Sequence, residues 1–385
     1  MGRWNVNSPP AQSRVRKILI LKFFFIFLLF SFLCTASFAQ QRTKKLIVIT
    51  LDGYRWKELF RGADSSLLLN KEFTSQDSAS TIKKYWSENI QKRREKLMPF
   101  FWNIIAKKGQ VYGNRDYGNY VDVTNRYWFS YPGYNEIFTG YADTLIYSNE
   151  YPDNPHQNVL EFINKLPKYK NKVAVFTSWD AFPRILNEKR SGLLINSSYS
   201  DLTGKLNQTQ KDLNRQQHYI PKIFGNAERL DVLTYSMAKA YLKQKHPKVL
   251  YLGFNDTDAF AHQGKYDFYL DAANYSDAMI SDLWEYLQSD PFYKDQTTLF
   301  ITVDHGRGEG DEWKHHNSKI EFANETWFAV MGPDTKPLGE LKSSGQIFQN
   351  QYAKTIAAFL GLNFPSVNPV GIEIKSVLNY KYPHK

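Results

Sequence analysis

The chain has 385 residues and a formal net charge of +11, with 42% hydrophobic and 16% aromatic residues. This apolar content excludes an intrinsically disordered chain, and the length suits one large domain or two smaller ones. The positive charge is compatible with anionic substrates, but it does not call for nucleic acid as a partner.

The N-terminal segment has the pattern of a secretory signal. Three basic residues within 14–17 precede an almost uncharged run over 18–33, and Ser37-Phe38-Ala39 has the small residues of a cleavage site. We therefore expect residues 1–39 to be a signal peptide and residues 40–385 to form a single periplasmic or secreted domain. A retained transmembrane anchor is the alternative, because the apolar run with its flanks approaches the length of a membrane span.

The one cysteine, Cys34, lies inside this segment. A chain cut after Ala39 therefore has no thiol, disulfide or cysteine nucleophile. Leu33 stands where a lipoprotein site requires a small residue, which disfavours lipidation. Cleavage also removes five basic residues and no acidic one, lowering the formal charge to +6. We expect no stable membrane association after cleavage and no specific binding of nucleic acid.

Several segments share one design, in which an apolar run ends on acidic or other polar side chains. Such runs are typical of buried parallel strands, whose carboxyl ends carry the ligand-binding groups of open α/β sheets. The predicted strands cover 44–51, 172–177, 248–254, 298–303 and 326–331, and the first four lead into Asp52, Asp180, Asp256 with Asp258, and Asp304.

Helical segments alternate with these strands. They are predicted over 54–60, 99–108, 132–139, 181–188, 228–244, 268–287 and 349–360. This alternation predicts an α/β fold with a doubly wound, mostly parallel sheet and helices on both faces. Two polar segments, about 65–96 and about 197–225, are expected to be insertions. The charged end of the first, residues 92–96, indicates either a solvated helix or an anion-binding patch or lid.

Ser130 stands just before the predicted helix that begins near Pro132 and ends at Gly140. The backbone N–H groups and dipole of a helix N-terminus stabilise a bound phosphate or a developing alkoxide. Ser130 is therefore a candidate nucleophile, and a simple N-cap is the alternative.

Acidic and histidine side chains gather at the later strand ends. Asp258 and His262 are four positions apart and share a face if that turn is helical; a surface ion pair is the alternative. Asp304 and His305 are adjacent, and the pair His315-His316 follows. A mixed Asp and His set without sulfur suits Zn²⁺ best, with Mn²⁺ or Fe as alternatives.

Two ions would explain the number of ligands. Ions about 4 Å apart can activate a hydroxyl nucleophile and neutralise phosphate oxygens during an in-line displacement. Ser130 would then attack and form a phosphoseryl intermediate. The two predicted ligand sets are Asp52, Asp304 and His305 with Ser130, and Asp258 and His262 with His316.

Taken in order, these motifs resemble the alkaline phosphatase superfamily, and within it the type I phosphodiesterase and nucleotide pyrophosphatase branch. The motifs are Leu51-Asp52-Gly53, Phe129-Ser130-Tyr131-Pro132-Gly133-Tyr134, Asp258 to His262, and Asp304-His305-Gly306 followed by a later histidine. The resemblance spans roughly 46–374. It implies an alkaline phosphatase-like fold, two zinc ions, and the ligand roles assigned above.

The chain departs from the family pattern at three places. The spacing from Trp313 favours His316 over His315, but Asn317 stands where a glycine often follows. Gly133 stands where the resemblance implies an asparagine that holds a phosphate oxygen, so Asn125 or Asn135 is the expected substitute. Sulfatases require an arginine where this chain has Tyr134, which argues against a sulfatase.

The expected function is a two-zinc phosphohydrolase acting on a small phosphate ester, with a phosphodiester or nucleotide preferred. Pocket walls are expected from aromatic and acidic residues that include Tyr54, Trp179 and Asp180. A phosphomonoesterase and a phosphonate or sulfate ester hydrolase are alternatives of the same superfamily. A metal-free, catalytically silent binding protein is the alternative from another class.

Overall fold

The computed structural model describes residues 1–4, 41–75 and 77–379. Its contacts divide the chain into a unit of residues 1–40 and a unit Gln41–Lys385, and only the second is considered below. The apolar run and cleavage site of the predicted signal peptide lie outside the described residues. Within the described ranges, no helix has both the length and the apolar character needed to cross a bilayer.

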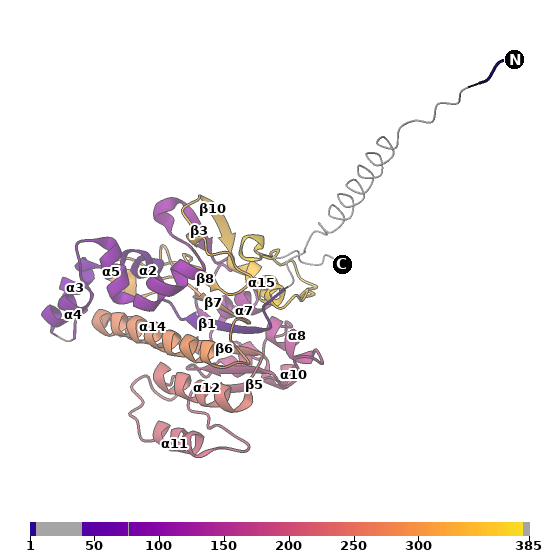
Figure 1. Ribbon diagram of the computed structural model, residues 1–385. Coiled ribbons are helices and arrows are strands. Elements are labelled where there is room, and N and C mark those ends of the chain that lie inside the picture. Colours follow the sequence, from indigo (N-terminus) through magenta and orange to yellow (C-terminus); the bar gives the residue numbers. More distant parts are fainter. Residues whose placement is uncertain (5–40, 76, 380–385) are drawn as a thin grey trace. The chain divides into compact units, whose positions relative to one another are not determined.

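An eight-stranded sheet and a two-stranded sheet are built from ten strands (Figure 1). The strands are β1 Lys45–Leu51, β2 Gln110–Tyr112, β3 Asn119–Asp122, β4 Val173–Thr177, β5 Leu194–Ser197, β6 Val249–Phe254, β7 Thr297–Thr302, β8 Phe328–Met331, β9 Gly339–Glu340 and β10 Gly345–Phe348. In the large sheet their order is β5-β4-β6-β1-β7-β8-β2-β9. The first five run parallel, and β8 is antiparallel to both of its neighbours. This confirms the predicted mostly parallel sheet.

Helices pack against both faces of this sheet (Figure 1). The α-helices are α2 Trp56–Arg61, α3 Ser65–Leu69, α4 Ser78–Tyr85, α5 Ile90–Leu97, α6 Ala106–Lys108, α7 Ser130–Thr139, α8 Val159–Lys165, α9 Phe182–Ile185, α10 Glu188–Ser191, α11 Gln208–Gln217, α12 Asp231–Lys245, α13 Asp256–His262, α14 Tyr266–Ser289 and α15 Tyr352–Phe359. Phe101–Ile105 (η1) is a π-helical turn, and the 3₁₀ turns are η2 Arg115–Tyr117, η3 Gly310–Lys314, η4 Gln349–Gln351 and η5 Lys375–Val377.

Alternate residues of β1 show why both faces are covered. Ile47 and Ile49 are buried in a core shared with α12 and α14, whereas Leu46 and Val48 are buried in a second core shared with α7, α8 and α15. Successive side chains of a strand point to opposite faces, so a continuous apolar run requires cover on both. The doubly wound α/β fold is therefore confirmed.

The predicted elements form with small shifts. All five predicted strands appear, as β1, β4, β6, β7 and β8. The helix expected over 99–108 is instead the π turn η1 followed by the single turn α6, and the helix expected from Pro132 begins at Ser130. Strands β3, β5, β9 and β10 were not expected, because runs of two to four residues give no periodic signal.

The two polar segments are helical in part. The first contains α3, α4 and α5. The second contains α11, which begins with a capping box between Asn207 and Gln210. Its far end is tied down by the buried Arg229, which donates to Gln217 Oε1 and Asn196 Oδ1 at 3.2 and 2.9 Å. This segment therefore contains a packed helix, although its composition is polar.

An acid on α14 holds the beginning of η1. Asp277 accepts hydrogen bonds from the backbone N–H groups of Phe100 and Phe101 at 2.7 and 2.8 Å. Burial raises the pKa of Asp277 to about 7, and these two hydrogen bonds lower it only in part. The segment that follows the first insertion is thus anchored on α14 by a buried carboxyl group.

Replacing this carboxyl group is expected to change the pH dependence of stability. The unfolded chain loses the Asp277 proton near pH 4, whereas the folded protein keeps it to about pH 7. The stability that Asp277 contributes therefore falls as the pH rises through this range. Between pH 5 and pH 7.5, the free energy of unfolding of Asp277→Asn should rise by about 2 kcal/mol relative to wild type. Urea unfolding at both pH values tests this, and a pH-independent difference would contradict it.

Candidate active site

Three acidic groups meet at one edge of the sheet because their strands are parallel neighbours. In the register, Leu51 of β1 pairs with Phe254 of β6, and Thr50 pairs with Thr302 of β7. Asp52 follows β1 directly, Asp304 stands two residues after β7, and Asp258 lies in α13 after β6. The carboxyl edge of an open α/β sheet is where its ligands bind.

The first cluster surrounds the imidazole of His305. Its Nε2 lies 3.4 Å from Asp52 Oδ1, 3.3 Å from Asp304 Oδ2 and 3.3 Å from Ser130 Oγ. Its Nδ1 lies 2.9 Å from the Gly306 carbonyl oxygen, to which it is placed to donate. All the side chains of this cluster are buried. Ligand atoms of Asp52, Asp304 and His305 lie within 4.8 Å of one another, so together they can hold a metal ion.

The two carboxylates of this cluster each have one oxygen fixed by the protein and one that is not. Tyr134 donates to Asp52 Oδ2 at 2.8 Å, and the Gly53 N–H donates to Asp304 Oδ1 at 3.1 Å. Asp52 Oδ1 and Asp304 Oδ2 are buried without a hydrogen-bond partner among the described residues. Buried, unpaired carboxylate oxygens are costly unless a cation faces them. The donor set therefore fits a divalent metal ion.

The electrostatics of this cluster favour added positive charge. Burial and the neighbouring acids raise the pKa of Asp304 well above its usual value, and burial and Asp258 raise that of Asp52. Burial alone would lower the pKa of His305, but Asp304 and Asp52 raise it to about 9. A cation held here would relieve the repulsion between the two carboxylates.

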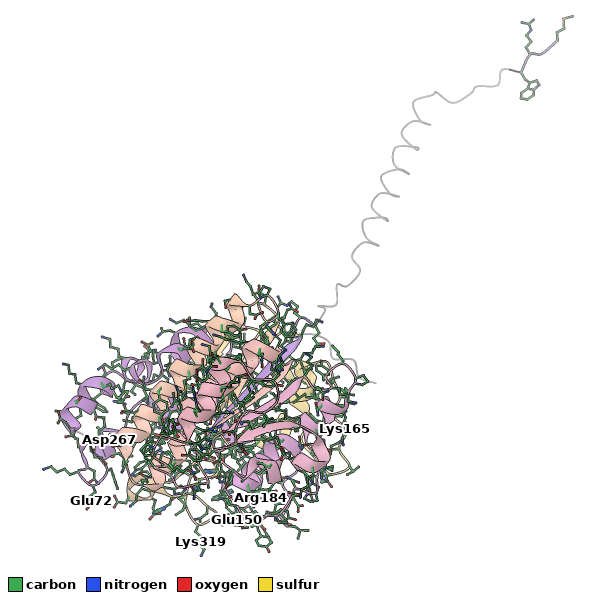
Figure 2. The ribbon with its side chains drawn as sticks, turned by 90° about the horizontal axis from the view of Figure 1, so that it is seen from below. Glu72, Glu150, Lys165, Arg184, Asp267 and Lys319 are labelled. Carbon is green, nitrogen blue, oxygen red and sulfur yellow. The ribbon has the colours of Figure 1, made fainter. Side chains whose placement is uncertain are left out.

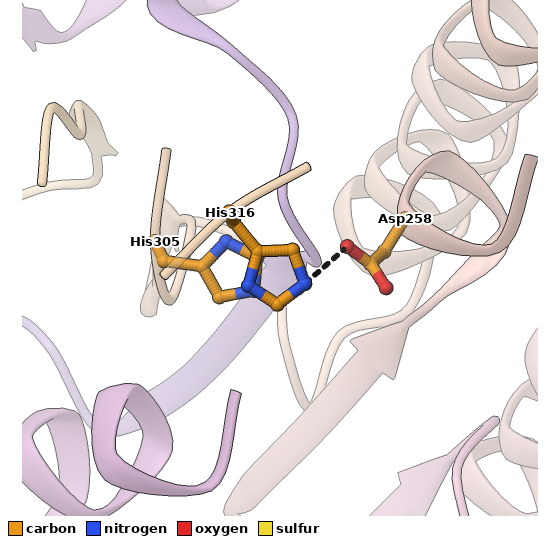
Figure 3. A group of neighbouring side chains, drawn as sticks. All are labelled: Asp258, His305 and His316. Carbon is orange, nitrogen blue, oxygen red and sulfur yellow. Dashed lines mark ion pairs between the residues drawn. The ribbon is translucent and has the colours of Figure 1, made fainter. Parts of the chain in front are cut away.

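The second cluster consists of Asp258, His262 and His316, and Figure 3 shows Asp258 and His316 of this cluster together with His305. His262 Nε2 lies 3.2 Å from Asp258 Oδ2, and His316 Nε2 lies 2.9 Å from His262 Nε2 and 3.7 Å from Asp258 Oδ1. The ring of His316 stacks on that of His305, with centroids 3.9 Å apart. His305 therefore joins the two clusters, and Asp258, His305 and His316 also offer ligand atoms within 4.8 Å of one another.

The two adjacent histidines differ in their surroundings. His316 lies in the second cluster, with its side chain 8% exposed, whereas His315 is exposed to solvent. The structure thus brings His316 to the predicted ligands. It brings together all seven residues predicted as metal ligands: Asp52, Ser130, Asp258, His262, Asp304, His305 and His316.

Arg307 is a site residue that the sequence did not reveal. Its buried guanidinium contacts Asp258 Oδ1, and it also donates to the Trp313 carbonyl at 2.9 Å and to the Lys314 carbonyl. Burial would raise the pKa of Asp258, but His262 and Arg307 hold it well below its usual value. Arg307 therefore fastens the loop that carries His316 to the acid of the second cluster.

Helix α7, which begins at Ser130, packs directly on the strand end that carries Asp304. A Cβ atom at Gly133 would lie 2.5 Å from the Asp304 carbonyl oxygen, so no side chain fits there. Gln349 donates to the carbonyls of both Gly133 and Asp304, at 3.0 and 3.1 Å. The glycine that replaces the expected asparagine thus allows Ser130, at the start of α7, to approach the acid cluster.

Both expected substitutes for that asparagine, Asn125 and Asn135, bind groups of the protein itself. Asn125 donates to Glu136, and its Oδ1 accepts from the backbone of Tyr127 and Trp128. Asn135 donates to the Tyr141 carbonyl at 2.7 Å and accepts from Asn154 at 2.9 Å. Both amides are buried and committed to the protein's own structure.

The three residues predicted to form pocket walls differ in their exposure to solvent. Tyr54 is fully buried and packs against Tyr269 and Trp327, with ring centroids 5.7 and 6.1 Å away, so it does not line a pocket. Trp179 is half-buried and Asp180 is exposed, which leaves both side chains accessible.

Asn149 is a second residue that the sequence did not reveal. Its Oδ1 accepts the Tyr131 N–H at 2.9 Å, so its amide lies at the N-terminus of α7 beside Ser130. Among the described residues, no hydrogen bond is found for its Nδ2. The following loop is fastened by Arg184, which donates to the Tyr151 carbonyl at 2.9 Å and pairs with Glu150 at 3.5 Å (Figure 2). The Asn149 amide therefore lies beside the first turn of α7.

The close contact between Gly133 and Asp304 predicts that no side chain is tolerated at residue 133. Gly133→Ala forces α7 away from Asp304 and is expected to lower the free energy of unfolding by about 1–3 kcal/mol, as overpacking does, and to reduce hydrolysis with it. Gly345→Ala is the matched control, because a Cβ there meets nothing within 4 Å. Urea unfolding of both variants tests this, and equal stability would contradict the close approach.

Comparison with known proteins identifies a family and similar folds. A family model described as type I phosphodiesterase / nucleotide pyrophosphatase matches residues 67–360. No curated protein matches the chain significantly. Three similar solved structures are alkaline phosphatase PafA (12% identity, 87% of this chain and 99% of that chain, TM-score 0.56), phosphonate monoester hydrolase of Agrobacterium radiobacter (11%, 87% and 77%, 0.54) and lipoteichoic acid synthase LtaP from Listeria monocytogenes (14%, 89% and 77%, 0.52).

At these identities, the structural likeness concerns the fold alone. The family match covers well over half of the chain and confirms the resemblance found in the motifs. It makes the protein a hydrolase of ester bonds in a metal-dependent family. The chain therefore belongs to the type I phosphodiesterase / nucleotide pyrophosphatase family.

Proposed function

We propose that this protein is a periplasmic or secreted two-zinc phosphohydrolase that cleaves phosphodiesters or nucleotides through a phosphoseryl intermediate on Ser130. One observation carries the proposal. Ser130 Oγ, Asp52 Oδ1 and Asp304 Oδ2 converge on His305 Nε2, at 3.3, 3.4 and 3.3 Å. A hydroxyl among two carboxylates and an imidazole is the ligand set of a metal-activated nucleophile.

The first zinc would be held by the His305 cluster and the second by Asp258, His262 and His316. When bound, zinc supplies positive charge that lowers the pKa of a nearby hydroxyl and neutralises phosphate oxygens. No cysteine lies within residues 40–385, so the ligands are nitrogen and oxygen atoms, which zinc accepts.

The chain's own residues would carry out the displacement. Ser130 Oγ would give up its proton to solvent and attack phosphorus while the bond from phosphorus to the leaving oxygen breaks, and the leaving oxygen would take a proton from water. A water molecule would then attack the phosphorus of the phosphoserine, release the phosphate product and return a proton to Ser130 Oγ. The N-terminus of α7 and the Asn149 amide would hold the phosphate oxygens during both steps.

Other esters are alternatives for the same site. Structures with this fold include an alkaline phosphatase and a phosphonate monoester hydrolase. Parallel assays with a chromogenic phosphodiester, phosphomonoester, phosphonate ester and sulfate ester separate these substrates, and we expect the phosphodiester to be cleaved fastest.

Removing the nucleophile is expected to abolish turnover without emptying the metal sites. Ser130→Ala should cleave a chromogenic phosphodiester at no more than background rate, while retaining about two zinc per chain, because the Asp and His ligands remain. Ser130→Thr is the matched variant, since it keeps a hydroxyl group and should retain measurable activity. Unchanged activity in Ser130→Ala would overturn the assignment. Clearly fewer than two zinc per wild-type chain would favour a silent binding protein.

Asn149 is expected to act through its amide donor. Asn149→Ala should lower kcat by roughly 100-fold, the usual loss on removing one oxyanion donor. Asn149→Asp keeps an oxygen that can accept from Tyr131 N–H but has no donor, so it should lose at least as much. Steady-state kinetics of both variants test this. Near-normal kcat in Asn149→Asp would show that the residue only fixes the backbone.

A further inference from the structure

We propose that a strained turn ahead of the nucleophile, residues Thr124–Trp128, orients His316 for metal binding, and that Asn125 and Glu136 are the positioning residues that hold this turn. The inference rests on the proposed function, because it concerns the ligands of the second zinc. It assigns to Asn125 a role different from the phosphate contact expected from the sequence.

The turn is fastened to the nucleophile helix through a buried acid. Glu136 on α7 accepts from the Thr124 N–H and hydroxyl on Oε1, at 2.8 and 2.7 Å. Its Oε2 accepts from the Asn125 N–H and side-chain amide, at 2.8 and 2.9 Å. Both carboxylate oxygens of a fully buried Glu136 are thus committed to two consecutive residues. The turn and α7, which begins at Ser130, therefore form one rigid frame.

Asn125 then shapes the rest of the turn. Its Oδ1 accepts from the backbone N–H groups of Tyr127 and Trp128, both at 3.0 Å. This is the local side-chain to backbone bonding by which asparagine stabilises turns. Because the Asn125 amide nitrogen is held by Glu136, the side chain cannot rotate away from these two N–H groups without losing that bond.

The frame holds Trp128 in an unfavourable backbone conformation. Its φ is 55°, in the left-handed region that bulky residues rarely adopt. Such strain persists only where the surroundings over-determine it, and it is concentrated at functional sites. The hydrogen bond from Trp128 N–H to Asn125 provides that restraint here.

The strained residue faces a candidate metal ligand. The Trp128 carbonyl oxygen lies 3.3 Å from His316 Nδ1 and is placed to accept from it. With its proton on Nδ1, His316 presents the lone pair of Nε2 toward Asp258 and His262, at 3.7 and 2.9 Å. Carbonyl oxygens that bind the outer nitrogen of a ligating histidine fix its tautomer and ring orientation. One turn would therefore position both the nucleophile and a ligand of the other cluster.

The test measures zinc binding by titration calorimetry on chelator-treated full-length protein. Asn125→Ala should weaken one of two binding events by 10-fold to 100-fold, the usual effect of losing an outer partner of a ligating histidine. The other event should change less than about threefold. Asn125→Ser should recover much of the lost affinity, because a hydroxyl accepts the same N–H groups more weakly.

Asn158→Ala is the matched control for general destabilisation. Asn158 is also buried and uses both ends of its amide, accepting from Glu161 N–H at 2.8 Å and donating to the Leu186 carbonyl at 3.0 Å. It caps α8 and should leave both binding events unchanged. Equal weakening in Asn125→Ala and Asn158→Ala, or no weakening in Asn125→Ala, overturns the positioning role.

A double-mutant comparison identifies the affected site. In a His316→Ala background, adding Asn125→Ala should weaken the remaining binding event no further, because the ligand that the turn orients is gone. Further weakening there would overturn the proposal. If wild-type protein binds zinc twice and Asn125→Ala changes neither event, only this inference fails. If wild-type protein binds no zinc, both this inference and the proposed function fail.

Discussion

The site depends on a charge imbalance that the parallel sheet creates. Strands β6, β1 and β7 bring Asp258, Asp52 and Asp304 to one edge, where burial removes the water that would solvate them. Two carboxylate oxygens there, Asp52 Oδ1 and Asp304 Oδ2, accept no hydrogen bond from the described residues and face the His305 imidazole. Their field explains the raised pKa of His305, the buried Arg307 beside Asp258, and the convergence of histidines on the same edge. The surrounding histidines and Arg307 offset part of that negative charge.

Much of this arrangement was predictable from local patterns of apolar and acidic residues in the sequence. An apolar run that ends in an acid signals a buried parallel strand, and several such runs must share an edge, so the meeting of Asp52 with Asp304 followed from the order of elements. The spacing of Asp258 and His262 predicted a shared helical face, which α13 provides. The spacing from Trp313 favoured His316 over the adjacent His315, and the packing brings His316 beside Asp258 and His262.

The roles of several polar residues were not predictable, because the sequence alone does not show which group a polar side chain binds. Asn125 and Asn135 stand close to the nucleophile in sequence, yet each amide is committed to other parts of the protein. Asn149 stands 18 positions from Tyr131, whose N–H it accepts, and no local signal marks it. Arg307 stands between Gly306 and Gly308, and no local pattern marks its contacts with Asp258 and with the carbonyls of Trp313 and Lys314.

The position of Gly53 limits how this site can evolve. Its φ is +57°, and a Cβ there would lie 2.7 Å from Arg307 Nη1, 2.8 Å from Asp258 Oδ1 and 3.2 Å from the His305 ring. A single methyl group would therefore press on both clusters at once, in a backbone conformation that other residues resist. Because Gly53 has no side chain, the His305 cluster and the Asp258 cluster can approach each other at this residue.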